Sequence, residues 1–118
     1  MCILLVLFAL FGCHPSPRSL TLVSGKTVYG DMALEDVHIE MFRREQTLWR
    51  YFSETRSGYH GSFRIHLPTG VYRITASKTL RIGHDEIQVT GKLEDLKVEN
   101  PGGRIDRVVI LMVPVSEP

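Results

Sequence analysis

The chain has 118 residues, with 14 Lys or Arg against 13 Asp or Glu, so its formal net charge at pH 7 is +1. This length is typical of a single domain, and the near-neutral balance leaves no basic surplus with which to neutralise nucleic-acid phosphates. Its only two cysteines, Cys2 and Cys13, lie close to the N-terminus. The rest of the chain therefore has no disulfide and no thiolate metal site, and we expect no nucleic-acid partner and no cofactor.

The N-terminal segment is strongly apolar. Residues 3–11 form an uninterrupted apolar run, which ends in Gly12-Cys13 and is followed by Pro15 and Pro17. A run of this length suits the apolar region of a secretory signal, which has about 7–15 residues. It is too short for a transmembrane helix, which needs about 20.

The segment Leu10-Phe11-Gly12-Cys13 resembles the lipobox of bacterial lipoproteins. In that family the cysteine is lipidated, with palmitate among its acyl chains, and becomes the new N-terminus. The resemblance implies a signal peptide over 1–12, a lipidated tether over 13–18 and a folded domain over 19–118. It also implies a bacterial cell-envelope protein anchored to a membrane at Cys13, on the periplasmic or extracellular face and in the outer membrane. The alternative is a buried N-terminal strand or helix, which the prolines after Cys13 disfavour.

Beyond the tether, apolar and polar residues alternate, which is typical of strands with one buried face. We expect a first strand over 20–30 broken near Gly25, a turn over 31–36, a strand over 37–41, a charged turn over 43–46 and an aromatic strand over 48–55. Next come a turn over 57–61, a strand over 63–67, a turn over 68–70 and a strand over 72–76. The remaining segments are a strand over 86–89, a strand or short helix over 93–98, a loop over 101–103 and a last strand over 108–113. About seven short strands at this spacing predict an all-β sandwich or barrel.

The alternation also predicts which side chains are buried. Phe63, Ile65 and Tyr72 are expected in the core, with the hydroxyl of Tyr72 finding a hydrogen-bond partner. Arg64 and His66, which alternate with them, are expected to face solvent.

Two stretches resemble the carboxypeptidase regulatory-like domains. Residues 25–39 are similar to the opening of that family, and residues 55–74 to its central motif, in which a glycine precedes a Phe-x-Ile-x-Leu-Pro-x-Gly-x-Tyr run. The family has a transthyretin-like (prealbumin-like) fold. The resemblance therefore implies an Ig-like, seven-stranded Greek-key β-sandwich over about residues 19–113. It implies no enzyme, because in peptidases this module accompanies a separate catalytic domain.

No motif in the chain points to catalysis. The five histidines lack His-x-His or His-Glu-x-x-His spacing, and no serine stands in a Gly-x-Ser-x-Gly elbow. We therefore expect no catalytic and no metal-binding residues, with a metal site at His60, His66 or residues 84–86 as the alternative. Arginines at 43, 44, 50, 56 and 64 are expected to be isolated surface residues, with contact to lipid headgroups or an anionic polymer as the alternative.

The aromatic strand is the candidate interaction site. Trp49 and Tyr51 should point to the face opposite Leu48 and Phe52, which gives the strand apolar groups on both sides. Two explanations of such a strand stay open: loops cover it, or it presents a patch to a partner. The main hypothesis is a non-catalytic envelope lipoprotein whose sandwich binds or scaffolds another envelope protein. The alternative is a carbohydrate- or peptidoglycan-binding module. A coplanar Trp/Tyr platform would favour the glycan, and an apolar edge with a polar rim would favour the protein.

Overall fold

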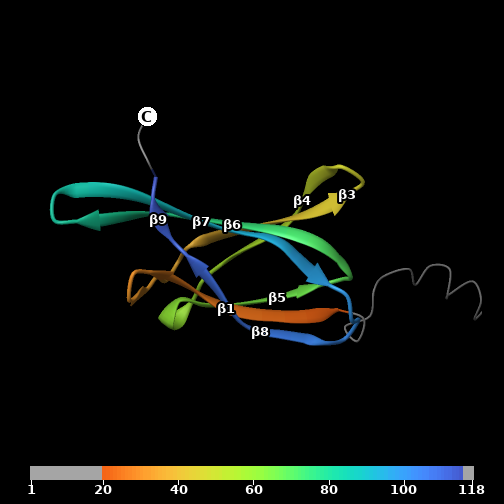
Figure 1. Ribbon diagram of the computed structural model, residues 1–118. Coiled ribbons are helices and arrows are strands. Elements are labelled where there is room, and N and C mark those ends of the chain that lie inside the picture. The colour runs from red at the N-terminus through yellow and green to blue at the C-terminus, as the bar shows by residue number, and fades with distance from the viewer. Residues whose placement is uncertain (1–19, 116–118) are drawn as a thin grey trace, which may run out of the picture.

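The computed structural model describes residues 20–115 and consists of two β-sheets stacked face to face (Figure 1). The four-stranded sheet contains β1 (Thr21–Tyr29), β2 (Met32–Ala33), β5 (Ser62–Leu67) and β8 (Arg104–Leu111). The five-stranded sheet contains β3 (His38–Glu45), β4 (Leu48–Arg56), β6 (Gly70–Ile82), β7 (Asp85–Val98) and β9 (Val113–Pro114). A single 3₁₀ turn, η2 (Tyr59–Gly61), connects β4 to β5. The expectation of an all-β fold with two sheets is confirmed.

The strand order defines the exposed edges. The five-stranded sheet runs β4-β3-β6-β7-β9 with antiparallel neighbours, so β4 and the short β9 are its edges. In the four-stranded sheet β1 is central: it pairs antiparallel with β2 and β5 and parallel with β8. The buried Met112 connects β8 to β9. At this residue the chain crosses from the four-stranded sheet to the five-stranded sheet. Within residues 20–115, no helix has the length and apolar character needed to cross a membrane.

The core fills the space between the sheets. Phe63, Ile65 and Tyr72 are buried, whereas Arg64 and His66 are exposed, as the alternation predicts. The hydroxyl of Tyr72 donates a hydrogen bond of 2.7 Å to the carbonyl of Pro68, just before β6. This bond satisfies the polar end of a fully buried ring. The other buried apolar side chains are those of Val23, Leu34, Val37, Ile39, Met41, Leu67, Ile74, Ala76, Leu80, Val89, Val98, Ile110 and Met112.

Several predicted boundaries are wrong. Strand β1 continues through Gly25, because the irregularity in its pairing with β8 is an insertion in β8 and not a break in β1. Strand β3 continues to Glu45, so residues 43–45 are strand and the turn is at 46–47, where Gln46 has a φ of 58°. The segments 86–89 and 93–98 are strand, as predicted, but they form one continuous strand, β7, and the alternative of a helix over 93–98 is wrong. The apolar run 108–113 is divided between β8 and β9.

Candidate interaction face

The predicted site residues Trp49 and Tyr51 lie together on the outer face of the five-stranded sheet. In the antiparallel pairing of β3 with β4, Tyr51 is opposite Phe42 and Trp49 is opposite Arg44. The register shifts between Met41 and Phe42, which leaves Phe52 without a cross-strand partner. The ring of Phe52 instead packs edge-to-face against the buried Tyr72, with centroids 5.6 Å apart. Phe52 therefore points toward the core side of β4, whereas Tyr51 packs edge-to-face on Phe42 at 6.0 Å.

The indole of Trp49 covers an arginine of β6. The guanidinium carbon of Arg73 lies 4.6 Å from the indole centroid, within the range of a cation–π contact. Arg73 is flanked in sequence by the fully buried Tyr72 and Ile74, so its side chain must leave β6 on the outer face. Its Nη2 lies 3.4 Å from Glu94 of β7, and its buried Nε has no hydrogen-bond partner among the described residues. Trp49 is consequently partly buried, while Tyr51 is 53% exposed.

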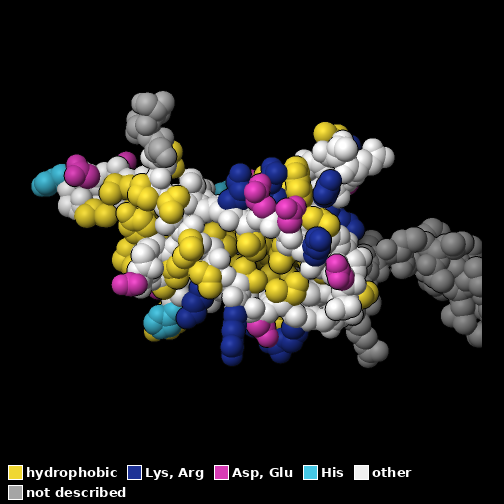
Figure 2. Space-filling view, in the orientation of Figure 1, with side chains coloured by type: hydrophobic (Ala, Val, Ile, Leu, Met, Phe, Trp, Pro, Cys, Tyr) yellow, Lys and Arg dark blue, Asp and Glu magenta, His cyan; other side chains and the backbone are white. Residues whose placement is uncertain are grey.

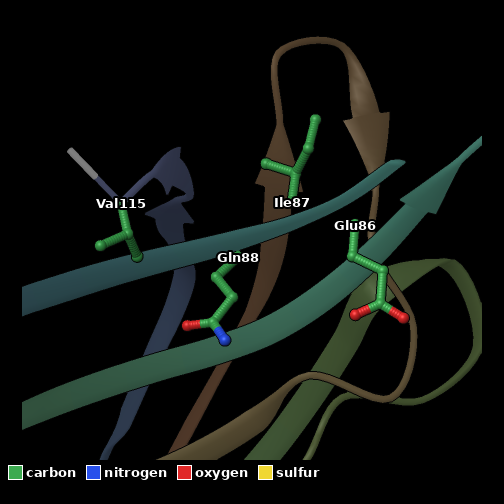
Figure 3. A pocket seen from close by; sticks show the side chains of 4 residues that line it. All are labelled: Glu86, Ile87, Gln88 and Val115. Carbon is green, nitrogen blue, oxygen red and sulfur yellow. The ribbon is translucent and has the colours of Figure 1, made fainter. Parts of the chain in front are cut away.

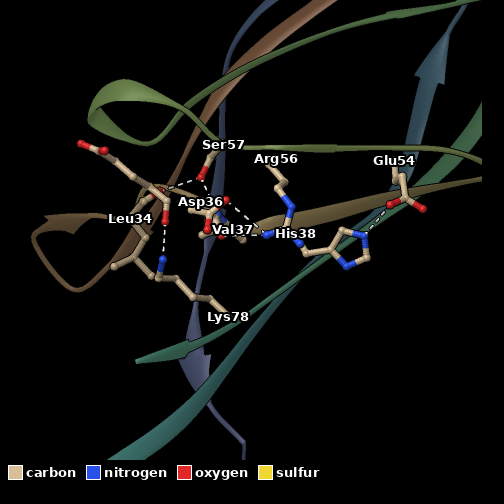
Figure 4. A network of polar contacts seen from close by, with 9 residues as sticks. Leu34, Asp36, Val37, His38, Glu54, Arg56, Ser57 and Lys78 are labelled. Carbon is tan, nitrogen blue, oxygen red and sulfur yellow. Dashed lines mark hydrogen bonds and ion pairs between the residues drawn. The ribbon is translucent and has the colours of Figure 1, made fainter. Parts of the chain in front are cut away.

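Glu54 links the aromatic residues to a histidine. The hydroxyl of Tyr51 donates a 2.6 Å hydrogen bond to one oxygen of Glu54. Nε2 of His38 lies 3.1 Å from the other oxygen, as Figure 4 shows. The hydrogen bond from Tyr51, followed by that from His38, holds the pKa of Glu54 below its ordinary value. The same bond to Glu54 raises the pKa of Tyr51 from 10.0 to about 12. The carboxylate is therefore ionised and the phenol protonated at neutral pH.

His38, Glu40 and Glu54 are the described residues that could hold a metal ion, since one donor atom from each lies within 4.8 Å of the others. His38 and Glu40 share a face of β3 by i, i+2 spacing, and Glu54 is the cross-strand partner of Glu40. One imidazole and two carboxylates are donors that zinc accepts. The metal candidates expected from the sequence are other histidines, and this group is not among them. The His-x-Glu spacing in β3 could have suggested two of its members, but the third follows only from the strand register.

A buried serine fixes the start of β3 against the end of β4. The hydroxyl of Ser57 donates to the carbonyl of Leu34 at 2.8 Å and accepts from the amide of Val37 at 2.9 Å (Figure 4). Backbone hydrogen bonds of 2.7 and 3.0 Å between Ser57 and Asp36 or Val37 close the same corner. This network holds the backbone next to His38 against the end of β4. It therefore helps to fix the register in which β3 pairs with β4.

A concavity lies beside the long hairpin formed by β6 and β7. It has a volume of about 430 Å³ and is lined by Glu86, Ile87, Gln88 and Val115. The amide of Val115 donates a 2.8 Å hydrogen bond to the carbonyl of Gln88, which holds the segment after β9 against β7. Figure 3 shows Glu86 and Gln88 on one side of β7 and Ile87 on the other. Glu86 is paired with Arg81 at 2.9 Å, so its carboxylate is already engaged by a neighbouring strand.

The remaining predicted site residue, Cys13, lies outside the described residues. Of the alternative metal candidates, His60 lies in η2 and His66 is exposed on β5, while residues 84–86 lie at the tip of the β6–β7 hairpin. The structure does not place them with the His38 cluster.

Comparison with known proteins gives the fold and little more. No protein-family model matches the chain, and no curated protein matches it. A similar solved structure is that of a 9R-lipoxygenase from Cyanothece PCC8801, with a TM-score of 0.52 and 12% sequence identity. The match covers 81% of this chain and 17% of that chain. At this identity the likeness concerns the arrangement of strands alone.

Proposed function

We propose that the protein is a non-catalytic lipoprotein of the bacterial cell envelope that binds a protein partner along the edge strand β4. In this proposal Cys13 carries the lipid anchor in the outer membrane, and residues 19–118 form the carboxypeptidase regulatory-like domain with a transthyretin-like Greek-key topology. The N-terminal motif and the central motif of residues 55–74 support these assignments. The two-sheet architecture is compatible with them.

The exposed edge of β4 carries the proposal. Among the described residues this nine-residue strand pairs only with β3, so one side of its backbone has free N–H and C=O groups. It also exposes large apolar side chains: 61% of Leu48, 53% of Tyr51 and 38% of Phe52. Long apolar edges are normally shielded against pairing with another chain. Here the charged residues of the strand are each paired on β3 or beside it, Arg50 with Glu45, Glu54 with His38 and Arg56 with Asp36. An apolar edge with a charged rim suits a peptide segment that adds as a further strand.

The aromatic geometry favours this reading over the glycan alternative. A sugar-binding platform needs coplanar, open aromatic faces. Here one face of Trp49 is occupied by Arg73, and the rings of Tyr51 and Phe42 are inclined at 78°. The aromatic residues thus make an irregular, partly filled surface rather than a flat one.

Site-specific photo-crosslinking in cells tests the proposal. A photoreactive amino acid at Leu48 should give one discrete protein adduct. The same group at Thr79, an exposed position of β6 away from the edge, is the matched control and should give none. Absence of a discrete adduct from Leu48, or an equal adduct from Thr79, would contradict the proposal. Soluble peptidoglycan fragments that abolish the adduct would favour the glycan alternative.

A further inference from the structure

The outer face of the four-stranded sheet gathers positive charge from segments far apart in the sequence. Lys26 of β1, Arg64 of β5 and Arg104 and Arg107 of β8 line one pocket, together with a single carboxylate, that of Asp106. We call these four cationic residues the basic face. Figure 2 shows Lys and Arg side chains projecting from the side of the molecule where β1 and β8 lie in Figure 1. Four cations against one anion is a marked local excess in a chain whose net charge is +1.

Strand alternation places these side chains away from the core. Lys26 precedes Thr27, whose buried hydroxyl donates to the carbonyl of Leu34 at 2.8 Å. Arg64 stands between the buried Phe63 and Ile65. Successive side chains of a strand point to opposite faces, so Lys26 and Arg64 point outward.

The insertion in β8 adds the third cation. The parallel pairing steps from Val23–Ile105 to Gly25–Val108, so Ser24 of β1 faces two residues of β8, Asp106 and Arg107. Arg107 adopts a φ of 64°, a left-handed conformation that is uncommon for a residue other than glycine. Such strained residues cluster at functional sites. Arg107 and Arg64, on the two strands that flank β1, therefore line the same concavity.

Most of this charge has no partner in the domain. Asp106 accepts a 3.0 Å hydrogen bond from Ser24 and lies 3.6 Å from Arg104, so its carboxylate is engaged. Lys26, Arg64 and Arg107 form no ion pair with any residue between 20 and 115. They border a concavity of about 560 Å³ whose remaining lining includes Phe63 and valines of β8.

An exposed apolar side chain adjoins the cations. Val109 is the cross-strand partner of Lys26 and is 51% exposed, and Leu111, two residues further along β8, is 65% exposed. Because Ile110 beside it is buried, Val109 lies on the outer face next to the cations, whereas Leu111 lines a separate concavity with Thr75 and Thr90 of the five-stranded sheet. Cations beside a protruding aliphatic group suit a lipid–water interface, where phosphates and acyl chains meet.

We infer that the basic face docks on the surface of an anionic bilayer, with Lys26, Arg64 and Arg107 contacting the phosphates of lipid headgroups. The inference rests on the proposed lipid anchor at Cys13, which stands seven residues before Leu20 and so tethers β1 within about 25 Å of the membrane. Docking of the four-stranded sheet leaves β4, at the edge of the other sheet, free for a protein partner.

Lysine footprinting on the full chain tests the inference. The protein is reconstituted in vesicles of phosphatidylcholine alone or mixed with phosphatidylglycerol, acetylated briefly and analysed by mass spectrometry. Acetylation of Lys26 should be slower by at least about fivefold on the anionic vesicles, because each of the three docking cations contributes a factor of about this size. Lys92, exposed on β7 beside Glu94, is the internal control and should react equally on both. High salt should remove the difference.

A pair of matched variants tests the residues. Replacing Arg64 by Gln together with Arg107→Asn, which tolerates a positive φ, should abolish the protection of Lys26. The control, Arg50→Gln with Arg81→Gln, removes the same charge from the five-stranded sheet and should leave the protection intact.

The outcomes separate the docking face from the anchor. If the chain stays on both kinds of vesicle but Lys26 reacts equally on each, the inference is overturned and the anchor stands. If the chain leaves neutral vesicles but Lys26 is protected on anionic ones, the anchor fails and the face is supported. If inorganic phosphate without vesicles protects Lys26 equally well, the site binds free phosphate and the membrane assignment is wrong.

Discussion

At the scale of single residues, Gly25 decides whether β8 can lie beside β1. A Cβ atom at this position would come within 2.1 Å of the carbonyl oxygen of Val108. Gly25 and Val108 are cross-strand partners, so their backbones cannot move apart without breaking the pairing of β1 with β8. Gly25→Ala should therefore lower the free energy of unfolding by about 2 kcal/mol or more, measured in urea. Gly58→Ala, whose Cβ would meet its nearest atom at 3.9 Å, is the control. An equal, small effect of both substitutions would mean that β1 and β8 are further apart than described.

The hydrogen bond between Tyr51 and Glu54 makes a second prediction at this scale. Glu54→Gln should lower the pKa of Tyr51 from about 12 toward 10.0, because the hydrogen bond to the Glu54 carboxylate is the main cause of the raised pKa. NMR titration of the tyrosine rings measures it, with the exposed Tyr59 as internal reference. A midpoint for Tyr51 that does not move in Glu54→Gln would show that the bond is absent in solution.

The same pair predicts how stability depends on pH. The folded-state pKa of Glu54 is depressed, so its contribution is present above its unfolded pKa and is lost as the pH falls through the folded value. The folded-state pKa of Tyr51 is raised, so its contribution is present below pH 10 and is lost as the pH rises toward about 12. Tyr51→Phe should flatten both limbs of the stability profile.

At the scale of elements, the sequence predicts strands best where one face is buried and the other solvated. Residues 62–67 alternate strictly, and β5 lies where it is expected. The prediction fails where charged residues resemble a turn: residues 43–45 belong to β3 because β4 pairs with all three of them, and β6 also pairs with Arg43. Gly25 is likewise typical of a strand break, but here it lies within β1. Its missing side chain lets the backbone of β8 approach closely.

The candidate sites show a similar limit. Sequence reasoning singled out Trp49 and Tyr51 because both stand on one aromatic strand, and the structure puts them on one face. The basic face was beyond its reach, because residues 26, 64 and 107 become neighbours only through the pairing of β1 with β5 and β8. Of these, only Arg64 entered the sequence analysis, as one of several scattered arginines.

The edge element β4 permits a test that separates binding from folding. Trp49→Ala loses a cation–π contact worth about 1 kcal/mol, and exposing the unpartnered Nε of Arg73 to water offsets part of that loss. Its free energy of unfolding should therefore change by about 1 kcal/mol or less, whereas Phe63→Ala in the core should cost about 3–5 kcal/mol. Binding of the crosslinked partner should nonetheless weaken by about 1–2 kcal/mol. A Trp49→Ala loss of stability as large as that of Phe63→Ala would refute its placement on the outer face.

At the scale of the whole molecule, the two sheets differ in what they present to their surroundings. The four-stranded sheet carries unpaired cations and the exposed Val109 on its outer face. The five-stranded sheet carries charges of both signs: Arg50, Arg73 and Arg81 pair with Glu45, Glu94 and Glu86, whereas Arg43, Arg44 and Lys78 donate to backbone carbonyls. If the proposed anchor at Cys13 holds β1 near a membrane, the basic face would be the side for the bilayer, and β4 on the other sheet would be the side for the partner.

The anchor itself is tested at Cys13, which lies outside the described residues. If this cysteine is lipidated, attachment comes from acyl chains at about 0.8 kcal/mol per buried methylene, and stable anchoring takes two or more chains. Cys13→Ser should then release the protein from the membrane fraction or leave an unprocessed precursor, detected by fractionation and by the mass of the N-terminal peptide. Cys2→Ser removes the other cysteine of the chain and is the matched control, with processing and fractionation unchanged. Normal processing and anchoring of Cys13→Ser would show that the apolar segment is not a lipoprotein signal, and the charge on the basic face would then need another anionic surface to explain it.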